Sequence, residues 1–313
     1  MSEIKTSILL GYECNNNCRF CYCDDKKDRF DSMTTEQVKQ ELDAGRERGS
    51  RWVDFLGGEP TIRKDIVELV SYAEEIGYET ISFTTNGKMF YYRDFAEKII
   101  DAGLNSIIFS VHGATPETHN WLVRDKKGFQ LMKKGIQNVV DISEDVYLCI
   151  NTVLTKENLD EVPEIPGVVN SFVEKDIEGI EMIFPHPKGG ALRNFEELVP
   201  DLDDVDEPVR KAIENAREEG FEHVVGRYVP FCHMEGVEDH VSEAEASERG
   251  ISEEHVGPEF RNLDVEKGRK EVGKVKTDVC KNCMYDDRCE GVWKEYAERR
   301  GTEELRAVGD NDG

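Results

Sequence analysis

The stretch from Ile4 to Cys21 reads IKTSILLGYECNNNCRFC: a short apolar run followed by closely spaced cysteines. The β-branched and apolar residues of Ile4–Leu10 predict a buried strand. Directly after it, Cys14, Cys18 and Cys21 offer three thiolates, and the Asn residues among them suit the bends of a loop that wraps a small object. Soft ligands in so short a loop favour an iron–sulfur cluster.

Short apolar runs alternate with amphipathic stretches through the first part of the chain. The predicted strands are Ile4–Leu10, Trp52–Leu56, Thr80–Thr85, Ser106–Val111, Val146–Leu154 and Gly179–Phe184. The predicted helices are Thr34–Arg48 (capped by Thr34 or Thr35), Ile62–Ile76, Tyr91–Ala102, Gly128–Val140 and Asn158–Val173. Strands separated by helices form a parallel sheet with right-handed crossovers. We expect an α/β fold: a partial (β/α)6 barrel with parallel strands, plus a small C-terminal iron–sulfur module.

Distinctive residues follow four of the predicted strands. The first cysteine group comes after the first strand, and Gly57-Gly58-Glu59-Pro60 comes after the second. Thr85-Asn86-Gly87 ends the third strand, and Ser110-Val111-His112-Gly113 ends the fourth. Because ligands of parallel sheets gather at the carboxyl ends of the strands, this edge is predicted to carry the site.

The pattern changes from about Pro185 to Pro, Gly and acidic residues. One helix is predicted at Pro208–Glu219, and Glu235–Glu254 is expected to be a solvated loop or surface helix because it is so rich in Glu. We expect a core barrel over residues 1–187, a connecting segment over 188–231, a cysteine-bearing module over 232–305 and a flexible tail over 306–313.

Composition narrows the function classes. Sixty-six Asp and Glu against 40 Lys and Arg give a formal charge of −26, which repels phosphate backbones and anionic membranes. No run approaches the roughly 18 apolar residues of a membrane span, and the N-terminus lacks an export signal. We expect a cytoplasmic protein that binds neither nucleic acid nor membrane. Because the cytosol keeps thiols reduced, we expect its nine cysteines to be metal ligands or catalytic thiols and not disulfides.

Spacing alone leaves alternatives for the first cysteine group. Zinc would need a fourth ligand, which Cys23 could supply, and Cys18 with Cys21 could form a thioredoxin-like dithiol. A cubane held by only three cysteines would instead leave one iron open to the amine and carboxylate of a small molecule.

The cysteine spacing, with Phe20 before Cys21 and Gly57-Gly58-Glu59-Pro60 one βα unit later, resembles the radical S-adenosylmethionine (SAM) superfamily over about Ile4–Pro187. The resemblance implies a [4Fe–4S] cluster on Cys14, Cys18 and Cys21 that binds SAM at its open iron. It also implies reductive cleavage of SAM to a 5′-deoxyadenosyl radical, which abstracts a hydrogen atom from the substrate, with an electron donor such as ferredoxin or flavodoxin.

The resemblance also implies which residues bind SAM. Gly57, Gly58 and Glu59 match the segment that meets the methionine amine, where a carboxylate suits an ammonium group. The other expected contacts are Thr85 and Asn86 at the methionine portion, Ser110 and Asn151 at the ribose, Arg124 at the carboxylate, and Phe20 and Tyr22 beside the adenine. His119, His186 and His233 are expected to be hydrogen-bonded supporting residues, and His112 to be structural.

The second cysteine group is Cys280-x2-Cys283-x5-Cys289, with Cys232 upstream. A four-cysteine zinc ribbon stays open on spacing alone. With Gly291 after it, the group resembles the C-terminal extension called SPASM, or its shorter twitch form. The full extension has another cysteine at the position of Trp293. The resemblance therefore implies one auxiliary [4Fe–4S] cluster on Cys232, Cys280, Cys283 and Cys289, acting as an electron relay or as a structural element.

The sequence says less about the substrate than about the SAM chemistry. Relatives with such extensions modify ribosomal peptides, mature other enzymes or dehydrogenate small alcohols and sugars. Peptide or protein modification is the favoured interpretation; a separate peptide-binding protein could help, because the first strand begins near residue 4. The alternatives are small-molecule dehydrogenation, epimerisation or coupling, and a non-catalytic iron–sulfur redox sensor.

Overall fold

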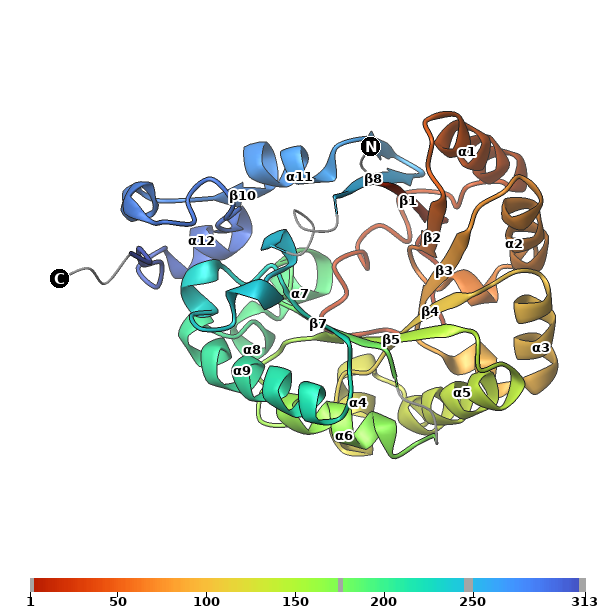
Figure 1. Ribbon diagram of the computed structural model, residues 1–313, viewed down its shortest axis with the longest axis horizontal. Coiled ribbons are helices and arrows are strands. Elements are labelled where there is room, and N and C mark those ends of the chain that lie inside the picture. The colour runs from red at the N-terminus through yellow and green to blue at the C-terminus, as the bar shows by residue number, and fades with distance from the viewer. Residues whose placement is uncertain (1–2, 174–176, 245–249, 310–313) are drawn as a thin grey trace.

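The computed structural model describes residues 3–173, 177–244 and 250–309. Its main feature is a curved nine-stranded sheet in the order β7-β6-β5-β4-β3-β2-β1-β8-β9, with helices along its outer side (Figure 1). The parallel strands are β1 (Glu3–Leu9), β2 (Trp52–Leu56), β3 (Thr80–Thr85), β4 (Ser106–Ser110), β5 (Tyr147–Val153), β6 (Gly179–Ile183), β7 (His223–Arg227) and β8 (Ile251–Gly257). The short β9 (Phe260–Asn262) runs antiparallel to β8. The expected α/β fold with a parallel, barrel-like sheet is confirmed.

The helices bury their apolar faces against this sheet, which places the core between the two layers. They are α1 (Thr35–Glu47), α2 (Ile66–Glu75), α3 (Arg93–Asp101), α4 (Pro116–Val123), α5 (Gly128–Ile142), α6 (Ile165–Asn170), α7 (Gly189–Arg193), α8 (Phe195–Leu198), α9 (Leu202–Glu218), α11 (Val265–Gly268) and α12 (Lys294–Arg300). Thr34 caps α1 in a capping box with Gln37. No helix in the described part of the chain is long and apolar enough to span a membrane.

Several predicted helices have different bounds in the structure; the one expected at Ile62–Ile76, for example, begins at Ile66. The helix expected at Asn158–Val173 is shorter: a 3-10 turn at Val162–Glu164 leads into α6. Pro163 and Pro166 lack the backbone N–H of an interior helical position, and each occupies one of the first positions of a short segment. The helix expected at Pro208–Glu219 begins earlier, at Leu202.

The prediction of a solvated loop or surface helix over Glu235–Glu254 was wrong at its C-terminal end. Residues 245–249 lie outside the described residues, but β8 begins at Ile251 and pairs with β1. Glu254 in this strand is buried because Arg48 donates to both of its oxygens at 2.7 Å and Thr6 donates at 2.6 Å. A paired carboxylate is compatible with the interior of a sheet, so a Glu-rich sequence did not mean an exposed one.

Charged pairs occupy the inside of the barrel. Lys5 of β1 contacts Asp54 of β2 at 3.4 Å, and both side chains are less than 10% exposed. Arg227 of β7 contacts Glu181 of β6 at 3.1 Å and Glu253 of β8 at 3.5 Å. Strands β7 and β8 are not neighbours in the sheet, so backbone hydrogen bonds do not join them. The Arg227–Glu253 pair connects these two strands.

Candidate active site

A cavity of about 970 Å³ lies at the carboxyl ends of the parallel strands. The last residues of five consecutive strands line it: Leu56, Thr85, Ser110, Val153 and Ile183. The loop after β1 and the segment from His255 to Trp293 complete the lining. The sheet edge that the sequence singled out is thus the edge at which the structure is hollowed.

The first cysteine group enters this cavity from the loop after β1, which runs inside the arc of strands (Figure 1). Cys14, Cys18 and Cys21 all line the cavity and are partly buried. Burial raises the pKa of each thiol, and the ammonium group of Lys27 opposes that effect at all three. Lys27, which the sequence analysis did not single out, is therefore the cation that all three sulfurs share.

Neighbouring elements hold the cysteine loop in place. Lys88 donates from Nζ to the carbonyl oxygen of Asn15 at 2.7 Å, to Oδ1 of Asn16 at 2.8 Å and to Asp125 at 2.6 Å. The backbone N–H of Gly190, in α7, donates to the carbonyl oxygen of Cys21 at 2.7 Å. Lys88 thus ties the loop to the end of α4, a role that depends on tertiary contacts and has no local sequence signal.

Glu59 is the most heavily hydrogen-bonded of the expected site residues. It is 4% exposed, and its carboxylate accepts from Oγ1 of Thr61 at 2.6 Å, from Oγ1 of Thr85 at 2.7 Å and from the backbone N–H of Asn86 at 2.8 Å. Burial raises the pKa of Glu59 and these hydrogen bonds oppose the rise. The carboxylate is therefore fixed where strands β2 and β3 end.

The glycines before Glu59 allow a close backbone approach. A Cβ atom at Gly58 would lie 1.9 Å from the carbonyl oxygen of Glu13, and Gly57 has a φ of 130°. The backbone N–H of Gly58 donates to the carbonyl oxygen of Gly11. Larger residues would push this segment away from the cysteine loop.

Ser110 and Asn151 lie side by side, because they are register partners at the ends of β4 and β5. Both line the cavity, and Oδ1 of Asn151 is a buried acceptor that has no hydrogen-bond donor among the described residues. A buried acceptor without a donor is costly, so a hydroxyl or amine of a ligand suits this position.

The remaining expected SAM contacts divide into two groups. Phe20 and Tyr22 line the cavity, where the Phe20 ring meets His112 edge-on at 4.7 Å and Tyr22 stacks near His186 at 6.4 Å. Arg124 is exposed and is not among the lining residues, because it ends α4 in a left-handed conformation with φ 54°. The cavity cations are instead Lys27, Lys188 and Arg269.

The histidines have separate roles. His112 accepts from the backbone N–H of Val153 and His119 accepts from that of His112, each at 3.2 Å. Burial lowers the pKa of both, to about 4 for His119, so both rings are neutral supports for the end of β4. His186 differs from the expected supporting role in one respect: it lines the cavity.

The second cysteine group assembles from two distant segments. Cys232 lies in the 3-10 turn Phe231–His233. Burial raises the pKa of the Cys289 thiol to about 11, and the backbone N–H of Phe231 opposes that rise. The Phe231 ring also stacks on Tyr285, which lies between Cys283 and Cys289, with ring centroids 4.6 Å apart. Phe231, next to Cys232, thus lies close to Cys289 and Tyr285 of the second group.

Within residues 3–173, 177–244 and 250–309, no three His, Cys, Asp or Glu side chains are placed to hold one metal ion.

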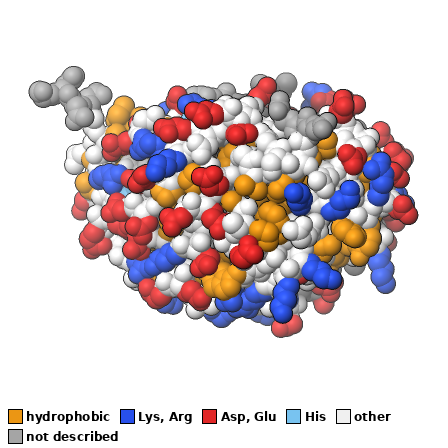
Figure 2. Space-filling view, turned by 90° about the horizontal axis from the view of Figure 1, so that it is seen from below, with side chains coloured by type: hydrophobic (Ala, Val, Ile, Leu, Met, Phe, Trp, Pro, Cys, Tyr) orange, Lys and Arg blue, Asp and Glu red, His pale blue; other side chains and the backbone are white. Residues whose placement is uncertain are grey.

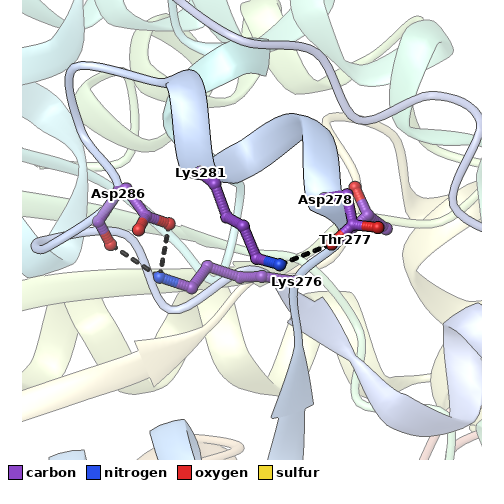
Figure 3. Close-up of a pocket in the computed structure, with 5 residues that line it drawn as sticks. All are labelled: Lys276, Thr277, Asp278, Lys281 and Asp286. Atoms are coloured by element: carbon purple, nitrogen blue, oxygen red, sulfur yellow. Dashed lines mark hydrogen bonds and ion pairs between the residues drawn. The ribbon is translucent and has the colours of Figure 1, made fainter.

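A second hollow, lined by residues of the segment 276–286, carries no comparable chemistry (Figure 3). It is lined by Lys276, Thr277, Asp278, Lys281 and Asp286. Its charges are matched internally, since Lys276 contacts Asp286 at 2.7 Å and Lys281 contacts Asp278 at 2.6 Å. The candidate site is therefore the large cavity at the strand ends.

The chain is similar to known proteins in both sequence and structure. A sequence model of the Radical SAM superfamily matches residues 8–166. The probable GTP 3′,8-cyclase of Sulfolobus acidocaldarius is 29% identical over 201 residues, covering 64% of this chain and 61% of that protein. The probable GTP 3′,8-cyclase of Saccharolobus solfataricus is 30% identical over 204 residues, covering 65% and 64%. The matched region thus spans less than two thirds of these relatives.

Solved structures are similar over nearly the whole chain. Streptococcus suis SuiB bound to S-adenosylmethionine has a TM-score of 0.68 and 16% identity, covering 98% of this chain and 77% of that chain. The anSMEcpe protein with bound AdoMet has a TM-score of 0.62 and 15% identity, covering 97% and 92%. At these identities the likeness establishes the fold alone.

Proposed function

The chain belongs to the radical SAM superfamily, and from that premise we propose that it holds a [4Fe–4S] cluster on Cys14, Cys18 and Cys21 and cleaves SAM beside it. The observation that carries the proposal is that these three sulfurs, the Gly57–Glu59 segment and the ends of β3 to β5 all line one cavity. The residues fit the two groups: the ammonium group of Lys27 acts to lower the pKa of all three thiols, and Asn151 offers an unused acceptor.

When bound, the cluster and SAM supply one-electron cleavage to methionine and a 5′-deoxyadenosyl radical that takes a hydrogen atom from the substrate. The chain's own residues bind and orient. Glu59 offers a fixed carboxylate for the methionine amine, Thr85 and Asn86 hold that carboxylate, and Ser110 and Asn151 offer polar groups to the ribose. Phe20 and Tyr22 flank the adenine in this proposal and exclude water there.

We also propose that Cys232, Cys280, Cys283 and Cys289 hold an auxiliary [4Fe–4S] cluster in a SPASM- or twitch-like module that follows the barrel. The contacts of Phe231 with Cys289 and Tyr285 support this grouping. Four cysteines leave no open iron, which favours accepting an electron from the substrate over binding it. Trp293, four residues after Cys289, lines the cavity and so connects the two regions.

The substrate that these observations favour is a small molecule. The curated relatives carry the name GTP 3′,8-cyclase, which denotes a small-molecule reaction, at about 30% identity. Peptide or protein modification, favoured from the sequence, is the second candidate. Its support is the formal charge of −26, which would attract a basic peptide. On the face in Figure 2, Asp and Glu are interspersed with Lys and Arg.

The test is SAM cleavage by the reconstituted protein. Under strict anaerobiosis with dithionite, we expect the wild type to convert SAM to 5′-deoxyadenosine, measured by liquid chromatography. Replacing Cys14, Cys18 and Cys21 with Ala should abolish the product. Cys149→Ala, which changes a buried cysteine of β5 outside the cavity, is the matched control and should retain it. Product from the triple variant would refute the assignment.

A further inference from the structure

The lining of the cavity has an unusual charge for this chain. Asp and Glu make up 66 of the 313 residues, about one in five. Among the described residues that line the cavity, however, Glu59 is the only carboxylate, and it is already hydrogen-bonded to Thr61, Thr85 and Asn86. Lys27, Lys188 and Arg269 line the same space. A cavity so poor in acid, within so acidic a chain, favours an anionic occupant.

Lys27 faces the first cysteine group, which leaves the two other cations for a second ligand. They belong to what we call the C-terminal wall: His186, Lys188, Tyr228, Arg269 and Trp293, all cavity-lining. The cavity volume of about 970 Å³ is at the upper end of the roughly 300–1,000 Å³ of ligand pockets.

Ring contacts make the wall rigid. Trp293 lies flat on His186 with centroids 3.9 Å apart, and the Tyr228 ring meets Trp293 at 4.8 Å. Tyr228 has a φ of 66°, a left-handed conformation that a bulky residue adopts only where its surroundings enforce it. The Arg269 guanidinium lies 5.7 Å from the Tyr228 ring.

Two buried donors of the wall have no acceptor. Trp293 is 5% exposed, and its Nε1 has no hydrogen-bond partner in the part of the chain that the structure describes. Nη1 of Arg269 makes no hydrogen bond there either, and its contact with Glu253 Oε2 is a long ion pair of 3.8 Å. Trp and Arg side chains can only donate, so what both atoms lack is an acceptor oxygen.

The carboxylates that pair with the wall's cations lie behind it. Arg269 donates from Nε to Glu290 at 2.8 Å, and Lys188 contacts Glu295 at 3.3 Å. Neither Glu290 nor Glu295 lines the cavity. These partners therefore hold the cations without adding a carboxylate to the cavity lining.

We propose that the C-terminal wall binds an anionic oxygen group, a phosphate or a carboxylate, on a small-molecule substrate, with Arg269 and Trp293 as its main donors. That the anionic group belongs to a substrate rests on the proposed function, but the anion site itself does not require SAM cleavage. It also argues against a basic peptide, whose charges would face Lys188 and Arg269.

The test measures anion binding by the anaerobically reconstituted full chain. The thermal unfolding midpoint is followed while sodium phosphate, or in a second arm sodium acetate, is titrated, with sodium chloride at equal ionic strength as the reference. We expect a saturable upward shift with at least one of the two anions beyond that of chloride; the anion with the larger shift identifies the group.

The variants locate the site. Arg269→Gln should weaken binding about tenfold or more, as expected for a lost charge-assisted hydrogen bond. Trp293→Phe keeps an aromatic ring, removes Nε1 and should weaken binding roughly three- to tenfold. If Arg269→Gln does not fold, since Glu290 has lost its partner, Trp293→Phe still tests the site. Arg93→Gln, on the exposed face of α3, is the matched control and should bind as the wild type does.

Two results would overturn the proposal: equal shifts with chloride and both anions, or an anion-specific shift that survives in folded Trp293→Phe and Arg269→Gln alike. The 5′-deoxyadenosine assay on the same samples separates the two claims. Anion binding that depends on Arg269 without SAM cleavage would overturn the proposed function alone. SAM cleavage without specific anion binding would overturn this inference alone.

Discussion

The rings of His186 and Trp293 are stacked 3.9 Å apart with planes within 5° of each other. His186 follows β6 in the barrel, whereas Trp293 follows the second cysteine group. One contact therefore fastens the C-terminal segment to the rim of the cavity.

Trp293→Ala should destabilise the protein by about 3–5 kcal/mol, because it removes a buried aromatic ring and its stacking partner contact. Urea unfolding under nitrogen measures the change. Trp293→Phe, which retains most of the packing, should cost clearly less. Equal stability of the Ala variant and the wild type would show that the stack does not hold the segment.

Lys27→Met should lower the reduction potential of the first cluster by tens of millivolts, because a cation near three cysteine sulfurs favours the added electron. The readout is an electron paramagnetic resonance redox titration. Lys27→Arg should keep the wild-type potential, as should Lys98→Met on exposed α3. An unchanged potential in Lys27→Met would place the ammonium too far from the cluster to matter.

Lys88→Met should reduce the iron retained by the first group, because the two hydrogen bonds that Lys88 donates to the cysteine loop are lost and Asp125 loses its cation. Iron per chain is measured after reconstitution and gel filtration. Lys134→Met, exposed on α5, controls for loss of a surface lysine. Full iron content in Lys88→Met would mean that the other loop contacts suffice.

Changing both Cys280 and Cys283 to Ala should lower the iron content from about eight to about four per chain. Cleavage of SAM should continue, since the first group is untouched, while substrate turnover should stop if the second cluster accepts an electron. Wild-type iron near four, accompanied by zinc, would contradict the auxiliary cluster.

Glu253→Gln should destabilise the protein by roughly 2–4 kcal/mol at neutral pH, because Arg227 loses the carboxylate that bridges β7 to β8. Glu68→Gln, which breaks an exposed pair with Lys39, should cost about 1 kcal/mol or less. Denaturant unfolding at matched salt measures both. Similar small losses in the two variants would show that the bridge adds little.

The pH dependence of that pair follows from its pKa. Burial alone would raise the pKa of Glu253, but Arg227 and Lys5 lower it to about 2, below its usual 4.5. A lowered carboxylate pKa stabilises the fold above 4.5, and the contribution is lost only as pH falls from there towards 2. The difference between wild type and Glu253→Gln should therefore be constant from about pH 6 to 8.

Much of the barrel could be predicted from the sequence because its information is local. The apolar runs that became β1 to β6 are each flanked by helices, and the motifs stand at their ends. Strand β8 could not be predicted in this way, because Glu253 and Glu254 suggest a solvent-exposed segment. In the folded chain they pair with Arg227 and Arg48, which are far away in sequence.

The site residues divide in the same way, into those placed by local sequence and those placed by tertiary contacts. Glu59, Thr85 and Asn151 reach the cavity because motif position fixes them at strand ends. Arg124 does not, since the turn that ends α4 directs the chain elsewhere. Lys88 and Arg269 gain their importance from contacts that only the folded chain creates.

The pairing of β1 with β8, in which Glu3 is opposite Ile251, has a consequence for how the protein matures. The strand that leads into the cysteine loop keeps one bare edge until about 250 further residues have left the ribosome. Such distant pairing makes folding slow and late. Metal loading must then either follow translation or proceed on a half-built barrel whose unpaired edge invites aggregation.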